Sequence, residues 1–196
     1  MTNDEKPSDS GTTEDEKHIR TVVEELTMDL LRQQNETGFP VFSEPVALVK
    51  SETTIARSIC EMSLRQITRA TDLEKQEAAE QQFLYDMMIL GATKLREKER
   101  HDPKTDLESS IAQTRDMLIQ KNREYGSAVF KKGKVFSKAS AEDAIRIRLN
   151  DKISRLAWMM QNPGEAIVQE DTEFDLTGYL ILMQVARRKS AGENPS

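Results

Sequence analysis

Side chains that could bind a phosphate group gather in the segment LIQKNREYGSA. Lys121 supplies an ammonium group, Tyr125 a phenol, and Gly126 follows at the expected end of a helix. Lysines continue beyond this point, so that residues 121–138 contain six cations and one acid. Ammonium and guanidinium groups bind phosphate oxygens through charge-assisted hydrogen bonds. The segment predicts a loop that binds a polyphosphate, and the alternative is a solvated basic loop.

A second polar cluster lies in the segment RIRLNDKISRL. Arg148, Asp151, Lys152 and Arg155 are spaced by three or four residues, which places them on one face of a helix. Apolar residues of the same helix fall on the opposite side. The cations of this face could bind phosphate oxygens. The alternative is a set of ion pairs within a solvated helix face, each worth about a few tenths of a kcal/mol.

A third cluster lies in the segment EDTEFDLTGYLIL, where Asp171, Asp175 and Tyr179 are spaced by four residues. Two carboxylates at this spacing can bind a hard cation such as Mg²⁺ when another helix adds further oxygens. The alternative is a helix N-terminus, with Thr172 as the cap and Asp175 as the third residue after it. Gly178 inside a helix costs roughly 1 kcal/mol relative to alanine, which indicates close approach of another helix or of a ligand.

The elements that must position these clusters are helices. The chain is 37% hydrophobic and 5% aromatic, is rich in good helix formers, and lacks runs of alternating β-branched residues. We therefore expect an all-α protein. The predicted helices cover approximately residues 18–35, 52–69, 73–99, 105–125, 140–162 and 171–189.

Apolar residues at spacings of three and four predict the buried face of each helix. In the first three helices these stripes are Ile19, Val23, Leu26 and Leu30; Ile55, Ile59 and Met62 with Gln66 or Ile67; and Leu73, Phe83, Leu84, Met87, Met88, Leu90 and Leu95. In the last three they are Leu107, Ile111, Thr114 and Leu118; Ile145, Leu149, Ile153, Leu156 and Met160; and Leu176, Leu180, Met183 and Ala186. A capping box from Thr105 to Glu108 and a cap at Ser140 predict where two of the helices begin.

Composition divides the chain into four regions. Residues 1–17 carry six acids and two lysines and are expected to form a disordered tail. Residues 18–104 form an N-terminal helical region, residues 105–190 form a helical domain that holds the three clusters, and residues 191–196 form a second tail. The stretch VFSEPVALVK is predicted to be a buried extended connector between two helices.

Several classes of protein are excluded by simple counts. Cys60 is the single cysteine, so no disulfide can form within the chain, and it is expected to be a packed residue in a reducing compartment. Neither His18 nor His101 has a second ligand at a spacing that suits zinc. No segment reaches the ~18 apolar residues of a membrane span, and the first residues lack the apolar core of a signal peptide. We expect a soluble cytoplasmic protein with no membrane partner.

The three segments, in this order and spacing, resemble the nucleotide-modification-associated domain family, which is found largely in phages and bacteria. The resemblance covers residues 105–190. The family pattern has a Lys and Tyr-Gly, then Arg-x-x-Asp-Lys-x-x-Arg, then an Asp-x-x-x-Asp-Leu-x-x-Tyr helix. This family is thought to be related to the MazG-like all-α nucleoside triphosphate pyrophosphohydrolases. Those enzymes are helical bundles that hold Mg²⁺ with carboxylates and cleave between the α- and β-phosphates of a nucleotide.

The resemblance implies roles for particular residues but assigns no catalytic residue. Its phosphate- and nucleotide-binding set is Lys121, Tyr125, Gly126, Arg148, Lys152, Arg155 and Tyr179, and its Mg²⁺ ligands are Asp151, Asp171 and Asp175. MazG-type enzymes carry Glu-x-x-Glu on the helix that here offers Glu108, Asp116 and Glu124. With fewer carboxylates, we expect the site to hold one Mg²⁺ rather than several. The chain could then bind a nucleotide without hydrolysing it.

The expected function is binding of a nucleotide, a deoxynucleoside phosphate, in a phage-type pathway of nucleotide or DNA modification. An enzymatic version would be Mg²⁺-dependent hydrolysis of a phosphoanhydride in a homo-oligomer, in the host cytoplasm if the chain is phage-encoded. One alternative is a non-catalytic helical binding or assembly protein, whose nine methionines line an adaptable interface. Another is nucleic-acid binding through the 121–138 loop, where Phe130 and Phe136 lie between lysines and could stack on bases.

Overall fold

The computed structural model describes residues 12–37, 52–99, 103–125, 127–131, 139–161 and 169–193, and the predicted connector VFSEPVALVK lies outside them. The described residues form six α-helices and one 3-10 helix, with no strand: α1 (Glu14–Thr37), α3 (Glu52–Arg69), α4 (Leu73–Glu99), α5 (Pro103–Tyr125), η1 (Ala128–Phe130), α6 (Ala141–Gln161) and α7 (Gln169–Ala191). The prediction of an all-α helical bundle is confirmed. None of the helices in this part of the chain combines the length and the apolar character that crossing a membrane requires.

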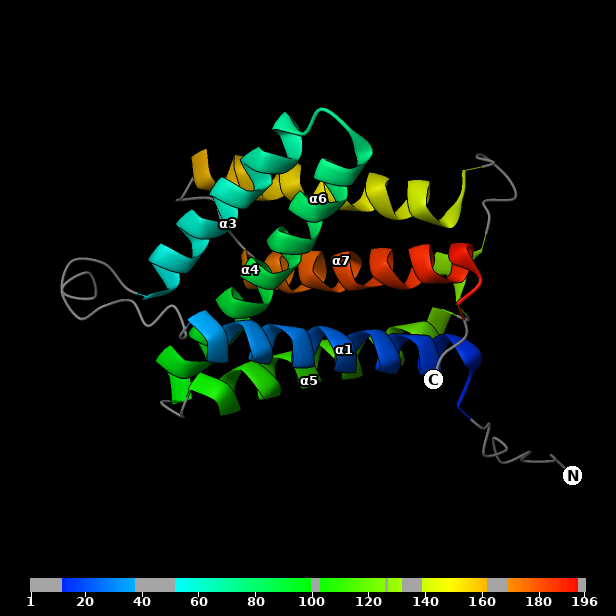
Figure 1. Cartoon of the computed structure of the whole chain (residues 1–196), viewed down its shortest axis with the longest axis horizontal. Helices are drawn as coiled ribbons and strands as arrows, with labels where there is room; N and C mark the ends of the chain where they lie inside the picture. Colours follow the sequence, from blue (N-terminus) through cyan, green and yellow to red (C-terminus); the bar gives the residue numbers. More distant parts are fainter. Residues whose placement is uncertain are drawn as a thin grey trace, which may run out of the picture.

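The helices are arranged around α7. Helices α1, α5, α6 and α7 run side by side along the long axis of the molecule, with α7 between α6 and α1 (Figure 1). Helices α3 and α4 pack closely against each other after a short turn, and α4 crosses α7 obliquely. Helix α5 packs mainly against α4 and α1, and α6 packs mainly against α7. Helix α7 therefore contacts four of the other helices, α1, α4, α5 and α6.

Buried apolar side chains from all six helices form one hydrophobic core. The stripes predicted for α1, α5 and α7 are buried throughout: Ile19, Val23, Leu26, Leu30, Leu107, Ile111, Thr114, Leu118, Leu176, Leu180, Met183 and Ala186. Helix α6 buries Ile145 and Leu149 deeply, while Ile153 and Leu156 are half-buried. Residues from the expected N-terminal region and from the expected C-terminal domain thus share a core.

Helix α1 begins four residues earlier than the sequence predicted, at Glu14. The Thr13 hydroxyl accepts a hydrogen bond from the backbone N–H of Glu16 at 3.2 Å, which is the bond of an N-cap residue. The Glu16 carboxylate is buried and accepts two 2.8 Å hydrogen bonds from the Arg123 guanidinium. Residues 14–17, placed in the disordered tail by their acidity, are therefore helical, because acids are favoured in the first turn of a helix and Glu16 has a cationic partner.

The two predicted helix starts in the second half have different outcomes. Ser140 caps α6 as expected, since its Oγ accepts from the Asp143 N–H at 3.1 Å and its own N–H donates to the Asp143 carboxylate at 3.3 Å. Helix α5 instead begins at Pro103, so Thr105 lies inside the first turn and the predicted capping box is wrong. Proline suits this position because its φ is already helical and it lacks the N–H that a helix start leaves unpaired.

The buried face of α3 also differs from the prediction. Met62 is 56% exposed and Ile59 is half-buried, whereas Ala56, Cys60 and Ser63 are buried. These three residues follow one another at spacings of four and three, and all are small. Small side chains let α3 approach α4 closely, so this face is selected by size rather than by hydrophobicity. Leu73, predicted to be buried, lies exposed at the start of α4. The burial of Cys60 itself is confirmed.

Candidate functional site

A cavity of about 540 Å³ lies between α5, η1, α6 and α7. Its volume is in the range of sites that bind small ligands, roughly 300–1,000 Å³. The polar side chains of its wall are Lys121, Asn122, Tyr125, Arg148, Asp175 and Tyr179. Its apolar wall is formed by Met117, Leu118, Ala128, Val129, Ala144, Gly178 and Leu182. The lining of the cavity thus combines charged and polar side chains with apolar ones.

The cavity gathers residues from all three segments that the sequence analysis selected. Lys121 and Tyr125 come from the last turns of α5, Arg148 from α6, and Asp175 and Tyr179 from α7. Three separate helices therefore bring these side chains together across more than fifty residues of chain. The packing of α5 and α6 against α7 produces this convergence.

Asp175 lies between two lysines from different helices. Lys121 Nζ donates to Asp175 Oδ1 at 2.8 Å, and Lys152 Nζ donates to Asp175 Oδ2 at 2.7 Å. The Lys152 side chain is more buried than that of Lys121, with 14% against 49% of its surface exposed. One carboxylate of α7 therefore links α5 to α6 at the edge of the cavity, and it joins Lys152 to the site.

The pKa values of this group follow from the two ion pairs. Burial alone would raise the pKa of the Asp175 carboxyl, but the hydrogen bonds and charges of the two lysines hold that pKa below its ordinary value. Burial would likewise lower the pKa of the Lys121 ammonium, and the hydrogen bond to Asp175 raises it above its ordinary value. The Asp175 carboxyl and the Lys121 ammonium are consequently both charged at neutral pH.

Arg148 gives the cavity an excess of positive charge. Its exposed guanidinium makes no hydrogen bond or ion pair with any residue of the described part of the chain. With Lys121 and Lys152, it sets three cations against the one carboxylate of Asp175. An anion entering the cavity would therefore meet a net positive field and a guanidinium whose donors are not used by any described residue.

Asn122 is a residue of the cavity wall that the sequence analysis missed. It is 7% exposed, and its Oδ1 atom has no hydrogen-bond partner among the described residues. A buried polar atom without a partner costs about 1–3 kcal/mol, which a water molecule or a ligand can offset. A signal was present in the sequence, because Asn122 continues the buried stripe of α5 four residues after Leu118, where an apolar residue would be expected.

The backbone around the end of α5 closes one side of the cavity. Ser127 has a left-handed conformation with φ of 60°, and its N–H donates to the Asn122 carbonyl at 3.1 Å. This turn reverses the chain so that Ala128 and Val129 of η1 lie against the cavity. The end of α5 was predicted at Gly126, which lies outside the described residues.

Gly178 lets α5 and α7 approach each other beneath the cavity. A Cβ atom at this position would lie 3.1 Å from Leu118 Cδ2 and 3.2 Å from Met117 Cε, closer than ordinary van der Waals contact. The sequence analysis inferred close approach of a helix or a ligand from this glycine, and the neighbouring helix is α5.

The remaining predicted site residues do not line this cavity. Asp151 and Arg155 are exposed on α6. The alternative for this face was a set of ion pairs within the helix, but among the described side chains neither residue forms one. The side chain of Asp171 lies outside the described part of the structure. The capping alternative for Asp175 is wrong, because α7 begins at Gln169 and Thr172 is buried inside its first turns.

The described residues do not fit a magnesium site. No three His, Cys, Asp or Glu side chains among them are grouped so that they could hold a metal ion. Both oxygens of Asp175 accept hydrogen bonds from ammonium groups, which would have to leave before a cation could bind. Because the Asp171 side chain is not described, the three-aspartate Mg²⁺ site stays a prediction.

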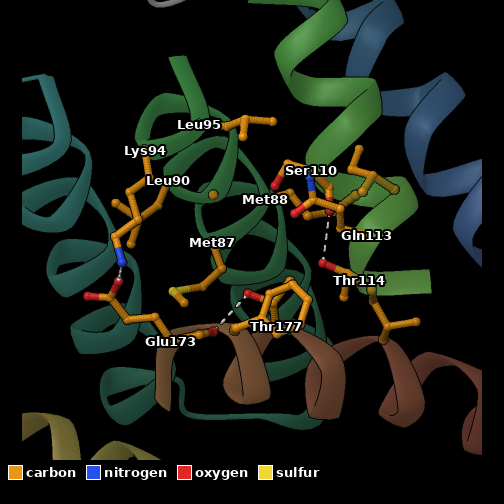
Figure 2. A pocket seen from close by; sticks show the side chains of 14 residues that line it. Met87, Met88, Leu90, Lys94, Leu95, Ser110, Gln113, Thr114, Glu173 and Thr177 are labelled. Carbon is orange, nitrogen blue, oxygen red and sulfur yellow. Dashed lines mark hydrogen bonds and ion pairs between the residues drawn. The ribbon is translucent and has the colours of Figure 1, made fainter. Parts of the chain in front are cut away.

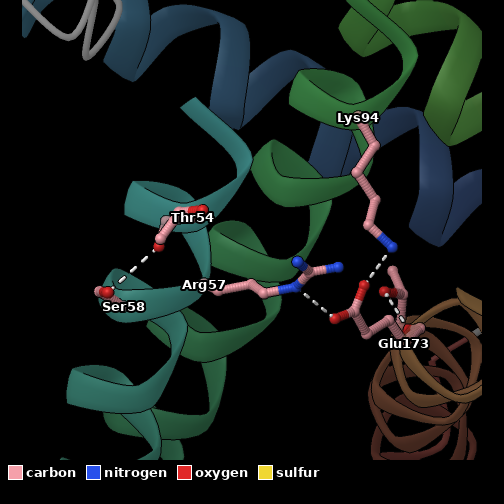
Figure 3. A network of polar contacts seen from close by, with 6 residues as sticks. Thr54, Arg57, Ser58, Lys94 and Glu173 are labelled. Atoms are coloured by element: carbon pink, nitrogen blue, oxygen red, sulfur yellow. Dashed lines mark hydrogen bonds and ion pairs between the residues drawn. The ribbon is translucent and has the colours of Figure 1, made fainter. Parts of the chain in front are cut away.

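A second cavity of about 310 Å³ lies between α4, α5 and α7. Figure 2 shows Lys94 reaching toward Glu173 on one side of it and Ser110, Gln113 and Thr114 on the other. Arg57 of α3 also reaches Glu173, with its Nε 2.8 Å from Oε1 (Figure 3). Glu173 therefore links α3 and α4 to α7. Asp175, two residues further along α7, links this helix to α5 and α6 in the same way.

Comparisons with known proteins identify no relative of this chain: no family model, no curated protein and no solved structure matches it significantly.

Proposed function

We propose that the cavity between α5, η1, α6 and α7 binds a small phosphate-bearing ligand, and that this ligand is a nucleotide. The observation that carries the proposal is the convergence of Lys121 and Arg148 in the lining of a cavity of about 540 Å³, with Lys152 held beside them by Asp175. Charged groups and apolar surface in one cavity suit a molecule with a phosphate and a flat ring system.

Each part of a nucleotide has a counterpart in the wall. The two lysines and Arg148 donate to phosphate oxygens, and the guanidinium can do so through two parallel hydrogen bonds. Tyr125 and Tyr179 offer ring faces and hydroxyl groups to a base or a sugar. The amide of Asn122 offers a donor and an acceptor to the same groups. The resemblance to the nucleotide-modification-associated family favours a deoxynucleoside phosphate.

Binding is proposed without hydrolysis. Mg²⁺-dependent cleavage of a phosphoanhydride requires carboxylates that are available to the metal, and Asp175 faces two ammonium groups instead. The magnesium site formed by Asp151, Asp171 and Asp175 stays a prediction that the resemblance supplies. Gly126 and Arg155 likewise keep their predicted roles in nucleotide binding from the resemblance alone.

A second candidate function, assembly through α6, is favoured by two exposed apolar side chains. Ile147 is 62% exposed and Trp158 is 49% exposed. They are eleven residues apart, which is close to three helical turns, so both lie on one face of α6. A second copy of the chain or another protein could cover this face. Nucleic-acid binding through the 121–138 loop has less support, because residues 132–138 lie outside the described part.

The nucleotide proposal is tested by thermal melting of the full chain against nucleoside and deoxynucleoside mono- and triphosphates, with and without Mg²⁺. A ligand at about 100 times its Kd adds roughly 2.7 kcal/mol of stability, which raises the Tm of a domain of this size by about 5–10 °C. We expect such a shift for one nucleotide or a small set of them. A pyrophosphate-release assay on the same samples tests hydrolysis.

Two arginines of α6 provide a matched pair of variants. Arg148→Gln removes the cavity guanidinium, so its ligand-induced shift should be lost or clearly reduced. Arg146→Gln removes an equal charge from the same helix at a position that does not line the cavity, so its shift should be that of the wild type. A flat panel for the wild type, or equal shifts in both variants, would contradict the proposal.

A further inference from the structure

We propose that Asp175 is an internal counter-ion that occupies the phosphate position of the empty cavity, and that a phosphate-bearing ligand displaces it from Lys121 and Lys152. This inference rests on the proposed function, and it adds how the empty site is stabilised. In this role Asp175 competes with the phosphate for the two lysines, whereas a metal ligand would help to hold the phosphate through the bound cation.

The geometry around Asp175 resembles that of a bound anion. Its two oxygens each accept one hydrogen bond from an ammonium group, at 2.8 Å and 2.7 Å, and the two lysines come from helices on either side of α7. A phosphate presents three oxygens, so it can accept from both lysines and also from Arg148, which the carboxylate leaves without a partner. Exchange of Asp175 for a phosphate would therefore use all three cations.

The burial of Lys152 explains why a counter-ion is needed. Its side chain is 14% exposed, and Asp175 is its ion-pair partner among the described residues. An ammonium group that is removed from water and left without an anion is strongly destabilising. The carboxylate therefore keeps the empty protein stable, and a ligand must replace that contact rather than simply add to it.

The test is calorimetric titration of inorganic pyrophosphate, without divalent metal and at fixed ionic strength, into the full-length wild type and Asp175→Asn. Asparagine keeps the shape of the side chain and removes one negative charge from beside the bound anion. We expect the Kd of the variant to be about 10-fold lower than that of the wild type, from the Coulomb energy of unit charges a few ångströms apart near a protein surface. The Tm of the ligand-free variant should also fall.

Glu173→Gln is the matched control, because Glu173 is also a carboxylate of α7 that faces two cations, Arg57 and Lys94. The Tm of this variant should fall as well. Its Kd for pyrophosphate should stay within about two-fold of the wild-type value, because Glu173 does not line the cavity between α5, η1, α6 and α7. A general effect of breaking ion pairs would instead change both variants alike and would overturn the inference.

The outcomes separate this inference from the proposed function. Unchanged or weaker binding by Asp175→Asn overturns the counter-ion role, while wild-type binding that Arg148→Gln weakens keeps the proposed function. Tighter binding by Asp175→Asn, or binding by this variant alone, supports the counter-ion role. Failure of both proteins to bind pyrophosphate and every nucleotide of the panel contradicts both proposals.

A measurement on the wild type covers the case in which Asp175→Asn does not fold. The pKa of the Asp175 carboxyl can be followed by carbon-13 NMR in the absence and presence of saturating pyrophosphate. Displacement from the two lysines should raise this pKa toward or beyond the ordinary value, because the hydrogen bonds that lower it are lost. An unchanged pKa in the presence of bound pyrophosphate would overturn the inference.

Discussion

Carboxylates that are wholly or partly removed from water differ in what they face. The buried Glu16 and the half-buried Asp175 accept hydrogen bonds from arginine and lysine side chains, whereas the buried Asp86 faces a serine and a glutamine. A cationic partner compensates a buried negative charge, but neutral donors do so less completely. The pKa values of the Glu16 and Asp175 carboxyls are accordingly lowered and that of Asp86 is raised, so the two kinds of carboxylate should respond to pH in opposite ways.

Asp86 provides the clearest prediction for stability. Burial raises the pKa of its carboxyl, and the hydrogen bonds from Ser63 and Gln82 offset only part of that increase. A carboxyl with a raised pKa in the folded state stabilises the fold below its unfolded pKa, near 4, and this contribution is lost as pH rises through the folded value. Asp86→Asn should therefore be more stable than the wild type at pH 7, by about 1 kcal/mol.

Urea unfolding of both proteins between pH 4 and pH 8 measures this effect. The stability difference should grow from pH 4 upward and then level off, because asparagine does not titrate. An amide can also donate to the Ser63 oxygen while the Ser63 hydroxyl donates to the Ile59 carbonyl, 3.2 Å away. Lower stability of Asp86→Asn at pH 7, or a difference that does not change with pH, would show that the ionised carboxylate is well accommodated.

At the residue scale, the sequence indicated which side chains belong to the candidate site, but it did not indicate which ion pairs those side chains form. Residue type and helical spacing were enough to select Lys121, Arg148 and Asp175. Spacing within one helix carries no information on partners from other helices, so the capture of Asp175 by two lysines could not be derived. Asn122 was missed because its place on the buried stripe was not weighed against its polar side chain.

At the scale of elements, helix positions followed closely from local signals. Caps, breakers and apolar periodicity depend on a few neighbouring residues, so α3 and α4 were predicted with the bounds that the structure shows. The face that α3 buries depends on how near another helix lies, which is not a local property. Of the larger apolar residues predicted to be buried, Ile59 is half-buried and Met62 is exposed, whereas the small residues Ala56, Cys60 and Ser63 are buried.

Substitutions on the two faces of α3 test this account. Ala56 is 2% exposed in the core, so Ala56→Leu adds three carbons to a close contact and should cost about 1–3 kcal/mol of stability. Met62→Gln, on the exposed face of the same helix, should change stability by less than about 0.5 kcal/mol. The stability of each variant is measured by urea unfolding at pH 7.

The opposite ranking would support the face predicted from hydrophobicity. If the sequence-derived stripe faced the core, Met62→Gln would bury an amide and destabilise the protein, while Ala56→Leu would lie on the surface and have little effect. Equal and small effects of both substitutions would indicate that α3 contributes little to the stability of the bundle.

At the scale of the whole molecule, one core and one central helix determine how the site is held. The cavity walls belong to α5, η1, α6 and α7, but α5 packs mainly against α1 and α4. The positions of Lys121 and Asn122 therefore depend on helices that contribute no side chain to the cavity. The resemblance covered the helices that carry the site, and no local pattern in the first half indicated that it supports them.

This dependence predicts that residues 103–193 do not fold alone, although they include every described residue of the cavity. Without α1 and α4, the apolar faces of α5 and α7 around Leu107, Ile111 and Ile181 would be exposed to water. A core of this kind that loses about half of its helices keeps too little buried apolar area to offset the conformational entropy of the chain. Circular dichroism during urea titration should show weak, gradual unfolding for the fragment and a cooperative transition for the full chain. A cooperative transition of the fragment, with an m-value in proportion to its length, would establish instead that the site belongs to an independent domain and that the first half is an accessory to it.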